Sequence, residues 1–148
     1  MSHVRTQIRN AVVGLLDSLA TTGDRAYSAR LSPIPQDRLP ALNIFVDDEA
    51  IEVQTIHDPV MLHRNASVRV ECISALADGL DDDLDQIALE VEHAIAADSD
   101  LGGILNGTMT PSGVEIDRSG EGSVPVGRLT LVYQVQYEVM NNAADVAI

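Results

Sequence analysis

The chain carries few side chains whose types and spacing could support chemistry. His57 and His63 flank Asp58 in a short segment beside Pro59, which raises the possibilities of a metal site or an acid–base pair. Their spacing places them on no common helix face and matches no standard zinc-ligand pattern. The segment is therefore predicted to be a connection between elements rather than a metal or catalytic site.

A run of carboxylates from Asp81 to Asp85 superficially resembles a calcium-binding loop. The EF-hand loop needs acids at alternate positions, a glycine at the sixth and a glutamate at the twelfth. Counted from Asp78, these positions hold Asp83 and Leu89, so the motif fails. Carboxylates in the first turn of a helix are stabilised by exposed N–H groups and by the helix dipole. The run is explained as a helix start, with Asp78 as the expected N-cap.

Motifs for phosphate binding or nucleophilic catalysis are also missing from the sequence. No glycine pair is followed by Lys-Ser or Lys-Thr between a strand and a helix, and no Gly-x-Ser-x-Gly occurs. Cys72 is the only cysteine, and its place in an apolar strand pattern predicts a small buried side chain. We therefore expect no catalytic residue, no metal ligand and no cofactor, and we do not expect an enzyme. A site shared across subunits would escape this reasoning.

The charge of the chain restricts its partners. Its 148 residues carry 23 acids against nine basic residues, for a net charge of −14, and every basic residue is arginine. Such acidity argues against a protein that neutralises nucleic-acid phosphates. The negative charge is compatible with a surface that repels DNA and lets it pass. Alternatively, it only keeps the protein soluble. No apolar run approaches the length of a membrane span, and the N-terminal residues lack the apolar core of a secretory signal.

Two segments repeat apolar residues at helical spacing, at residues 3–19 and 79–97, and Gly23 is expected to end the first. The apolar stripe of the first comprises Val4, Ile8, Val12, Leu15, Leu16 and Leu19. That of the second comprises Leu80, Leu84, Ile87, Ala88, Val91 and Ile95.

Alternation of apolar and polar residues predicts the strands. We expect a hairpin of residues 42–46 and 50–56 with the acids Asp47, Asp48 and Glu49 at its tip. The other expected strands are residues 25–30, 66–75, 108–117 (interrupted by Pro111 and Gly113) and 128–140.

The order of these elements predicts an α+β fold. One-sided burial gives alternating strands, so we expect one mainly antiparallel sheet with two amphipathic helices packed on one face, plus extended loops or arms. Three prolines between residues 32 and 40 predict a stiff extended arm. We expect a single domain over residues 1–148, with 140–148 as a flexible tail that is frayed or free to dock on a neighbour. The polar side of the sheet is exposed to solvent, packs against a neighbouring subunit or lines a channel; the sequence leaves these three alternatives open.

Four segments, in their order and spacing, carry a family resemblance. They are VRTQIRNAVVGLL, RAYSARLSPIPQDRLPALNIFVDDE, ASVRVECISALADGLDDDLDQIALEVEHAI followed by LGG, and VGRLTLVYQVQYEV. Together they cover most of the chain, which resembles the tail terminator proteins of long-tailed bacteriophages, the minor tail protein U-like family. No single short motif is specific to this family.

The resemblance implies a late-expressed structural virion protein, made in the host cytoplasm and placed at the head-proximal end of the tail. Such proteins form a ring, usually hexameric, that caps the tail tube, stops tube polymerisation and provides the docking surface for the head-completion protein. DNA passes through the ring without specific binding, and no membrane is involved. The family has no catalytic motif to transfer.

Loops presented by a rigid sheet commonly carry contacts, so we expect three segments to mediate ring and tube contacts. They are the arm Ser32–Pro40 with Pro33, Pro35 and Arg38, the tip Asp47–Glu49, and the loop Arg118–Gly127. Four arginines are candidate partners for acids of an adjacent subunit, although single surface pairs contribute little. They are Arg30, Arg38, Arg69 and Arg128. The alternatives are another neck or head–tail connector protein, or a small non-enzymatic binding module.

Overall fold

Alternating burial along the strands builds a single five-stranded sheet in the order β1-β2-β3-β5-β4. The computed structural model describes residues 2–119 and 125–148. The chain forms α1 (Val4–Leu16), β1 (Ala26–Ser28), the 3-10 turn η1 (Gln36–Arg38), β2 (Ala41–Val53), β3 (Met61–Ala75), α2 (Leu80–Ala97), β4 (Thr110–Ser119) and β5 (Val126–Met140). All neighbouring strands are antiparallel except β1 and β2, which are parallel. The α+β fold is confirmed.

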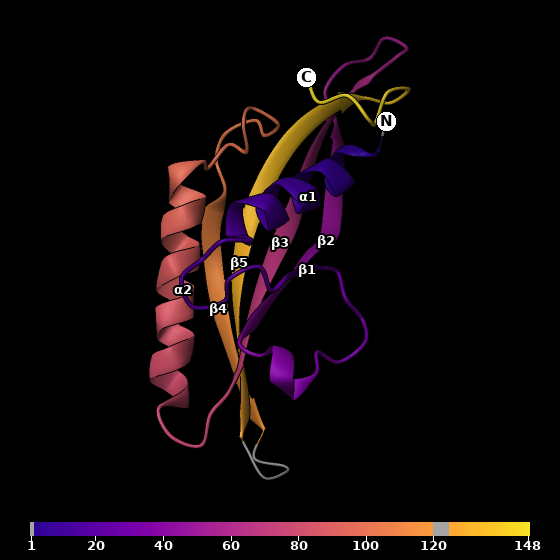
Figure 1. The fold of residues 1–148 in the computed structure, drawn as a ribbon. Coiled ribbons are helices and arrows are strands. Elements are labelled where there is room, and N and C mark those ends of the chain that lie inside the picture. The colour runs from indigo at the N-terminus through magenta and orange to yellow at the C-terminus, as the bar shows by residue number, and fades with distance from the viewer. Residues whose placement is uncertain (1, 120–124) are drawn as a thin grey trace.

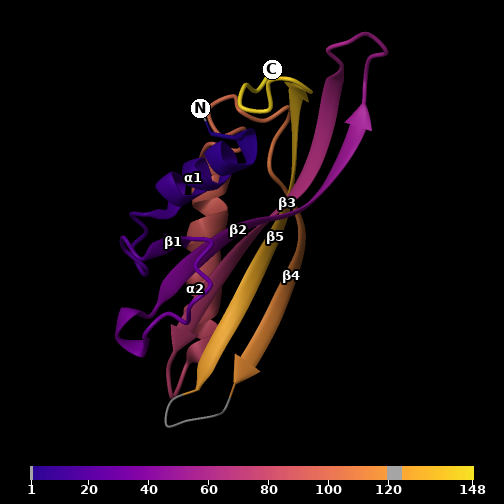
Figure 2. The same ribbon diagram turned by 90° about the vertical axis from the view of Figure 1, so that its right-hand side faces the viewer.

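Both helices lie on the same side of the sheet (Figure 2). α1 packs against β1 and β2, and α2 packs against β3 and β5. The helix stripes and the helix-facing strand residues meet in one core. Val68, Val70 and Cys72 of β3 are fully buried in it, as their alternation with Arg69 and Glu71 predicts. The expected apolar residues of β5 are also buried there; they are Leu129, Leu131, Tyr133, Val135, Tyr137 and Val139.

The expected hairpin with a tip at Asp47–Glu49 is wrong. β2 is one strand from Ala41 to Val53, and its pairing with β3 shifts between Asp47 and Glu49. Asp48 is the extra residue, with a positive φ of 37°, which identifies a β-bulge. Before the bulge the even-numbered residues of β2 face the helices, and after it the odd-numbered residues do. In the sequence, this break in the alternation looks like a turn between two strands. The real hairpin turn lies between Val53 and Met61 and extends beyond α1 (Figure 1).

The helix ends also differ from the expectation. α1 ends at Leu16 rather than residue 19, and Gly23 donates its N–H to Leu19 O at 2.8 Å with a positive φ. At α2 the N-cap is Gly79, with φ of 74° and no side-chain cap, so the assignment of Asp78 is wrong. The first turn of α2 does carry Asp81, Asp82 and Asp83. Backbone geometry at Gly79, rather than a side-chain oxygen, therefore starts this helix.

The segment expected to be a flexible tail makes backbone contacts with its own chain. Ala144 O accepts from Val4 N at 3.0 Å, and Ile148 N donates to Glu138 O at 2.9 Å. Both chain ends therefore lie at the same end of the sheet (Figure 1).

Neither helix within residues 2–119 and 125–148 combines the length and apolar character needed to cross a membrane.

Candidate functional site

The sheet face opposite the helices is the candidate functional site. We call it the polar sheet face. Its polar residues come from β2, β3, β4 and β5 and lie between helix-facing core residues along each strand. The ten in its central part are Asp47, Ser67, Arg69, Glu71, Ser112, Glu115, Asp117, Arg128, Thr130 and Gln134.

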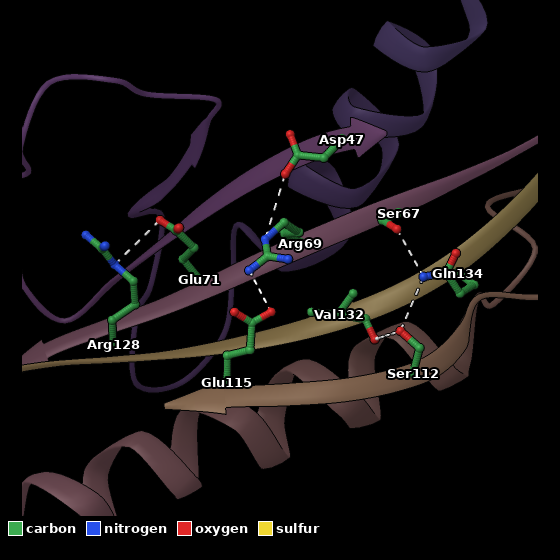
Figure 3. Close-up of polar contacts among 9 residues, drawn as sticks. All are labelled: Asp47, Ser67, Arg69, Glu71, Ser112, Glu115, Arg128, Val132 and Gln134. Atoms are coloured by element: carbon green, nitrogen blue, oxygen red, sulfur yellow. Dashed lines mark hydrogen bonds and ion pairs between the residues drawn. The ribbon is translucent and has the colours of Figure 1, made fainter. Parts of the chain in front are cut away.

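Arg69 is the central cation of the polar sheet face (Figure 3). Its Nη2 donates to Glu115 Oε2 at 2.8 Å, and its Nε lies 3.7 Å from Asp47 Oδ2. The guanidinium therefore connects β3 with β4 on one side and with β2 on the other. Its side chain is 30% exposed, so solvent limits what these ion pairs add to stability, to about 1 kcal/mol or less each.

A second polar group lies farther along the same face. Gln134 donates through Nε2 to Ser67 Oγ at 3.0 Å and to Ser112 Oγ at 3.3 Å. The Ser112 hydroxyl in turn donates to Val132 O at 3.2 Å (Figure 3). Arg128 Nε lies 3.7 Å from Glu71 Oε1 toward the other end of the face. These contacts hold the polar side chains in place across three strands.

The charges of this face remain net acidic. Among these ten residues, the two guanidinium groups of Arg69 and Arg128 are outnumbered by four carboxylates. These carboxylates belong to Asp47, Glu71, Glu115 and Asp117. A surface of this sign repels phosphates instead of binding them. Chemically, the face is suited to solvation or to passing an anionic polymer.

The Pro-rich arm borders the polar sheet face. Pro33 and Pro35 are exposed, and Arg38 lies exposed on η1. Arg30 stacks on the Tyr27 ring at 5.0 Å and donates to the carbonyl oxygens of residues 32 and 33. The arm is tied to β2 because Asn43 accepts from Arg30 N at 3.0 Å and donates to Arg30 O at 2.9 Å.

The structure separates the three acids that the sequence analysis grouped together. Asp47 and Asp48 are exposed, whereas the Glu49 side chain is 10% exposed and lies on the helix side. Glu49 Oε2 accepts from Arg5 at 2.6 Å and from Arg64 at 2.9 Å, and its Oε1 accepts from the Tyr137 hydroxyl. Glu49 therefore ties α1 to β2, β3 and β5.

The loop Arg118–Gly127 is described at its ends alone, because residues 120–124 lie outside the described residues. Arg118 donates from Nε and Nη2 to the two carboxylate oxygens of Asp81 at 2.8 and 2.9 Å. This bidentate pair joins the end of β4 to the start of α2. The hydrogen bonds from Arg118 lower the pKa of Asp81.

The side chains first considered for chemistry do not converge. His63 lies 3.7 Å from Glu138, which also accepts from Asn106 at 2.6 Å, whereas His57 is exposed in the turn after β2. Across residues 2–119 and 125–148, no three His, Cys, Asp or Glu side chains form a group that could hold a metal ion. Cys72 is fully buried in the core, and this burial raises the pKa of its thiol to about 12.

Sequence reasoning missed the exposed apolar residues of the edge strand. Val114 and Ile116 of β4 point to the helix side, yet they are 54% and 50% exposed because α2 covers β3 and β5 instead. Their alternation with Glu115 and Asp117 is visible in the sequence. Their exposure depends on the position of β4 at the sheet edge, which the sequence did not predict.

The comparisons with known proteins agree with the resemblance found in the sequence. Residues 3–137 match the family described as phage minor tail protein U. Among solved structures, a chain from the virion of a native gene transfer agent particle matches with a TM-score of 0.52 and 15% identity. The match covers 93% of this chain and 100% of that chain, and at this identity it supports the fold alone. No curated protein sequence matches the chain significantly. The family match spans every helix and strand through most of β5, and the chain belongs to the phage minor tail protein U family of tail structural proteins.

Proposed function

We propose that the chain is a tail terminator: a subunit of a ring, hexameric in its completed form, that caps the head-proximal end of the tail tube. The ring stops tube polymerisation and offers the docking surface for the head-completion protein. Its partners are further copies of itself, the tube protein and the neck. The observation that carries the proposal is the family match over residues 3–137.

The acidity of the chain supports the same role. A net charge of −14 per subunit is multiplied in a ring, so DNA passing through the lumen would meet a repulsive surface. The polar sheet face is a suitable lining, because Arg69 and Arg128 are already engaged with carboxylates of their own chain. DNA is then a passing polymer and not a specific ligand.

A capping assay tests this proposal. Tube protein that polymerises alone is mixed with increasing amounts of the chain, and tube lengths are measured by negative-stain microscopy. We expect shorter tubes, each with a ring at one end. Unchanged tube lengths at saturating concentration would contradict the proposal. If the chain binds to the portal side instead, it is a connector protein. If it stays monomeric and does not bind tubes, it is a small binding module.

The three expected contact segments can be tested in the same assay. Variants are Pro33→Ala with Pro35→Ala and Arg38→Ala for the arm, Asp47→Asn with Asp48→Asn, and Arg118→Ala for the loop. Glu49 stays intact, because its side chain is held inside the protein. We expect each variant to need a roughly tenfold higher concentration for capping, which corresponds to about 1.4 kcal/mol.

Fold integrity is the control for these variants, measured by thermal unfolding. All the substituted side chains are exposed, and the Arg118–Asp81 pair that is lost lies at the surface, so the unfolding temperature should change little. Normal capping by a chain that carries all three sets of changes would contradict these contact segments and leave the terminator proposal intact.

A further inference from the structure

The sheet ends in two strand edges that have no backbone partner among the described residues. β4 pairs with β5 along its length and with no strand on its other side. β1 covers β2 at Leu42–Ile44 alone, so from Phe45 to Val53 β2 pairs with β3 and leaves its other edge open. The open segments have similar lengths. An open edge presents unpaired N–H and C=O groups that can pair with another chain.

Exposed apolar residues lie on the same side of both edges. Val114 and Ile116 of β4 pair in register with the buried Leu131 and Leu129, which places them on the helix side of the sheet. On β2, Ile51 and Val53 are 53% and 60% exposed. Val53 pairs in register with the buried Leu62, so it also faces the helix side, and so does Ile51, which alternates with it.

The strand directions allow these edges to join. β2 and β5 run one way, while β3 and β4 run the other, because each neighbouring pair is antiparallel. If β4 of one copy lies beside β2 of the next, the two strands are antiparallel and continue the existing pattern. A ring of identical subunits requires two different surfaces that fit each other, and the two sheet edges meet that requirement.

We propose that the ring closes by pairing the β4 edge of one subunit with the Phe45–Val53 edge of β2 in the next copy. The inference rests on the proposed ring-forming function. Pairing places Val114 and Ile116 beside Ile51 and Val53 of the neighbour, so that apolar surface is buried on the helix side. In a closed ring, the open edge of β4 is paired in every subunit. The bulkier helix layer fits the longer outer circumference, which places the polar sheet face toward the lumen.

The seam brings carboxylates together on its polar side. Glu115 and Asp117 of β4 approach Asp47 and Glu52 at the edge of the neighbour's β2. Like charges in adjacent strands oppose pairing, and salt screens them over a Debye length of about 10 Å at 0.1 M. The ring should therefore assemble more readily as ionic strength rises.

Cysteine cross-linking tests the seam. Ile51→Cys and Val114→Cys are made in separate chains, mixed under conditions in which rings form or on tube ends, and treated with a short bis-maleimide. We expect covalent dimers in the mixture and none with either variant alone. A chain with both changes should give a series of cross-linked oligomers, the largest of which contains as many subunits as the ring. Native Cys72 is fully buried and should not react.

The matched control is Gln86→Cys mixed with Ile51→Cys. Gln86 is exposed on α2 and donates to Glu90, which accepts from Thr21 after α1. It therefore lies on the side of α2 away from β4 and should not cross-link. Dimers formed by Val114→Cys alone would mean a two-fold contact and would overturn the proposal. Rings or capped tubes without 51–114 products would overturn the seam while the terminator function stands. Failure to assemble or cap at all would overturn both.

Charged substitutions give an independent measurement. Val114→Lys with Ile116→Lys should raise the concentration needed for assembly by at least about tenfold, because buried lysine would oppose edge pairing. Gln86→Lys, on the side of α2 away from β4, should leave assembly unchanged. Circular dichroism and thermal unfolding establish that each variant is folded. Unimpaired assembly of a folded double-lysine variant would overturn the seam.

Discussion

Glu49→Gln should lower the free energy of unfolding by about 3 kcal/mol, since removing one partner of a buried ion pair leaves the other charge uncompensated. The Arg64 side chain is 11% exposed and depends on the Glu49 carboxylate at 2.9 Å, while its buried Nε has no hydrogen-bond partner in the described structure. Arg5 and the Tyr137 hydroxyl also donate to Glu49. Urea unfolding at pH 7 measures the loss.

The effect of Glu49 should depend on pH. Burial alone would raise the pKa of Glu49, but hydrogen bonds from Tyr137, Arg64 and Arg5 outweigh it and lower the pKa below the ordinary value of 4.5. The carboxylate therefore stabilises the folded chain fully above about pH 4.5, and the stabilisation is lost as the pH falls through the lower folded-state pKa. The difference between wild type and Glu49→Gln should stay constant from pH 7 to 5 and narrow below that.

Glu52→Gln is the matched control for this prediction. Glu52 is an exposed acid of the same strand, and its substitution should change the free energy of unfolding by less than about 0.5 kcal/mol. Equal losses in the two variants would show that the buried cluster contributes nothing beyond general charge.

Ile87→Ala should lower the free energy of unfolding by about 3 kcal/mol, within the range for removing several buried methylene groups from a packed core. Ile87 is fully buried where α2 packs against β3 and β5. Leu89→Ala on the same helix is the control, because Leu89 is 45% exposed and leaves no closed cavity. Thermal or urea unfolding of both variants makes the comparison. Similar losses would mean that α2 is not anchored by this face.

The elements with one-sided burial were predictable from the sequence. α2 and β5 carry their apolar residues at periods of 3.6 and 2, and both formed with nearly the expected bounds. The expected break at Pro111 and Gly113 corresponds to a shift in the β4–β5 register. In these segments the local pattern and the tertiary contacts require the same conformation, so the sequence alone is sufficient.

Long-range contacts were not predictable in the same way. Glu49 and Tyr137 are 88 positions apart, and the local sequence around Glu49 reads as a solvated acidic turn. Its burial follows from the bulge and from the position of α1 above β2. The open edges were equally hidden, because the place of β4 outside β5 depends on the strand order of the whole sheet. Ring and tube contacts involve other chains and remain proposals.

The bulge at Asp48 also determines how β2 tolerates changes in length. Asp48 is the one extra residue between Asp47, opposite Ser67, and Glu49, opposite Ala66. Deleting Asp48 alone would straighten the strand and leave every later side chain on its present face. Deleting a single residue elsewhere in β2 would turn one part of the strand over, exchanging its core and solvent faces. Asp48 is thus the position in β2 where the loss of one residue would preserve both faces of the strand.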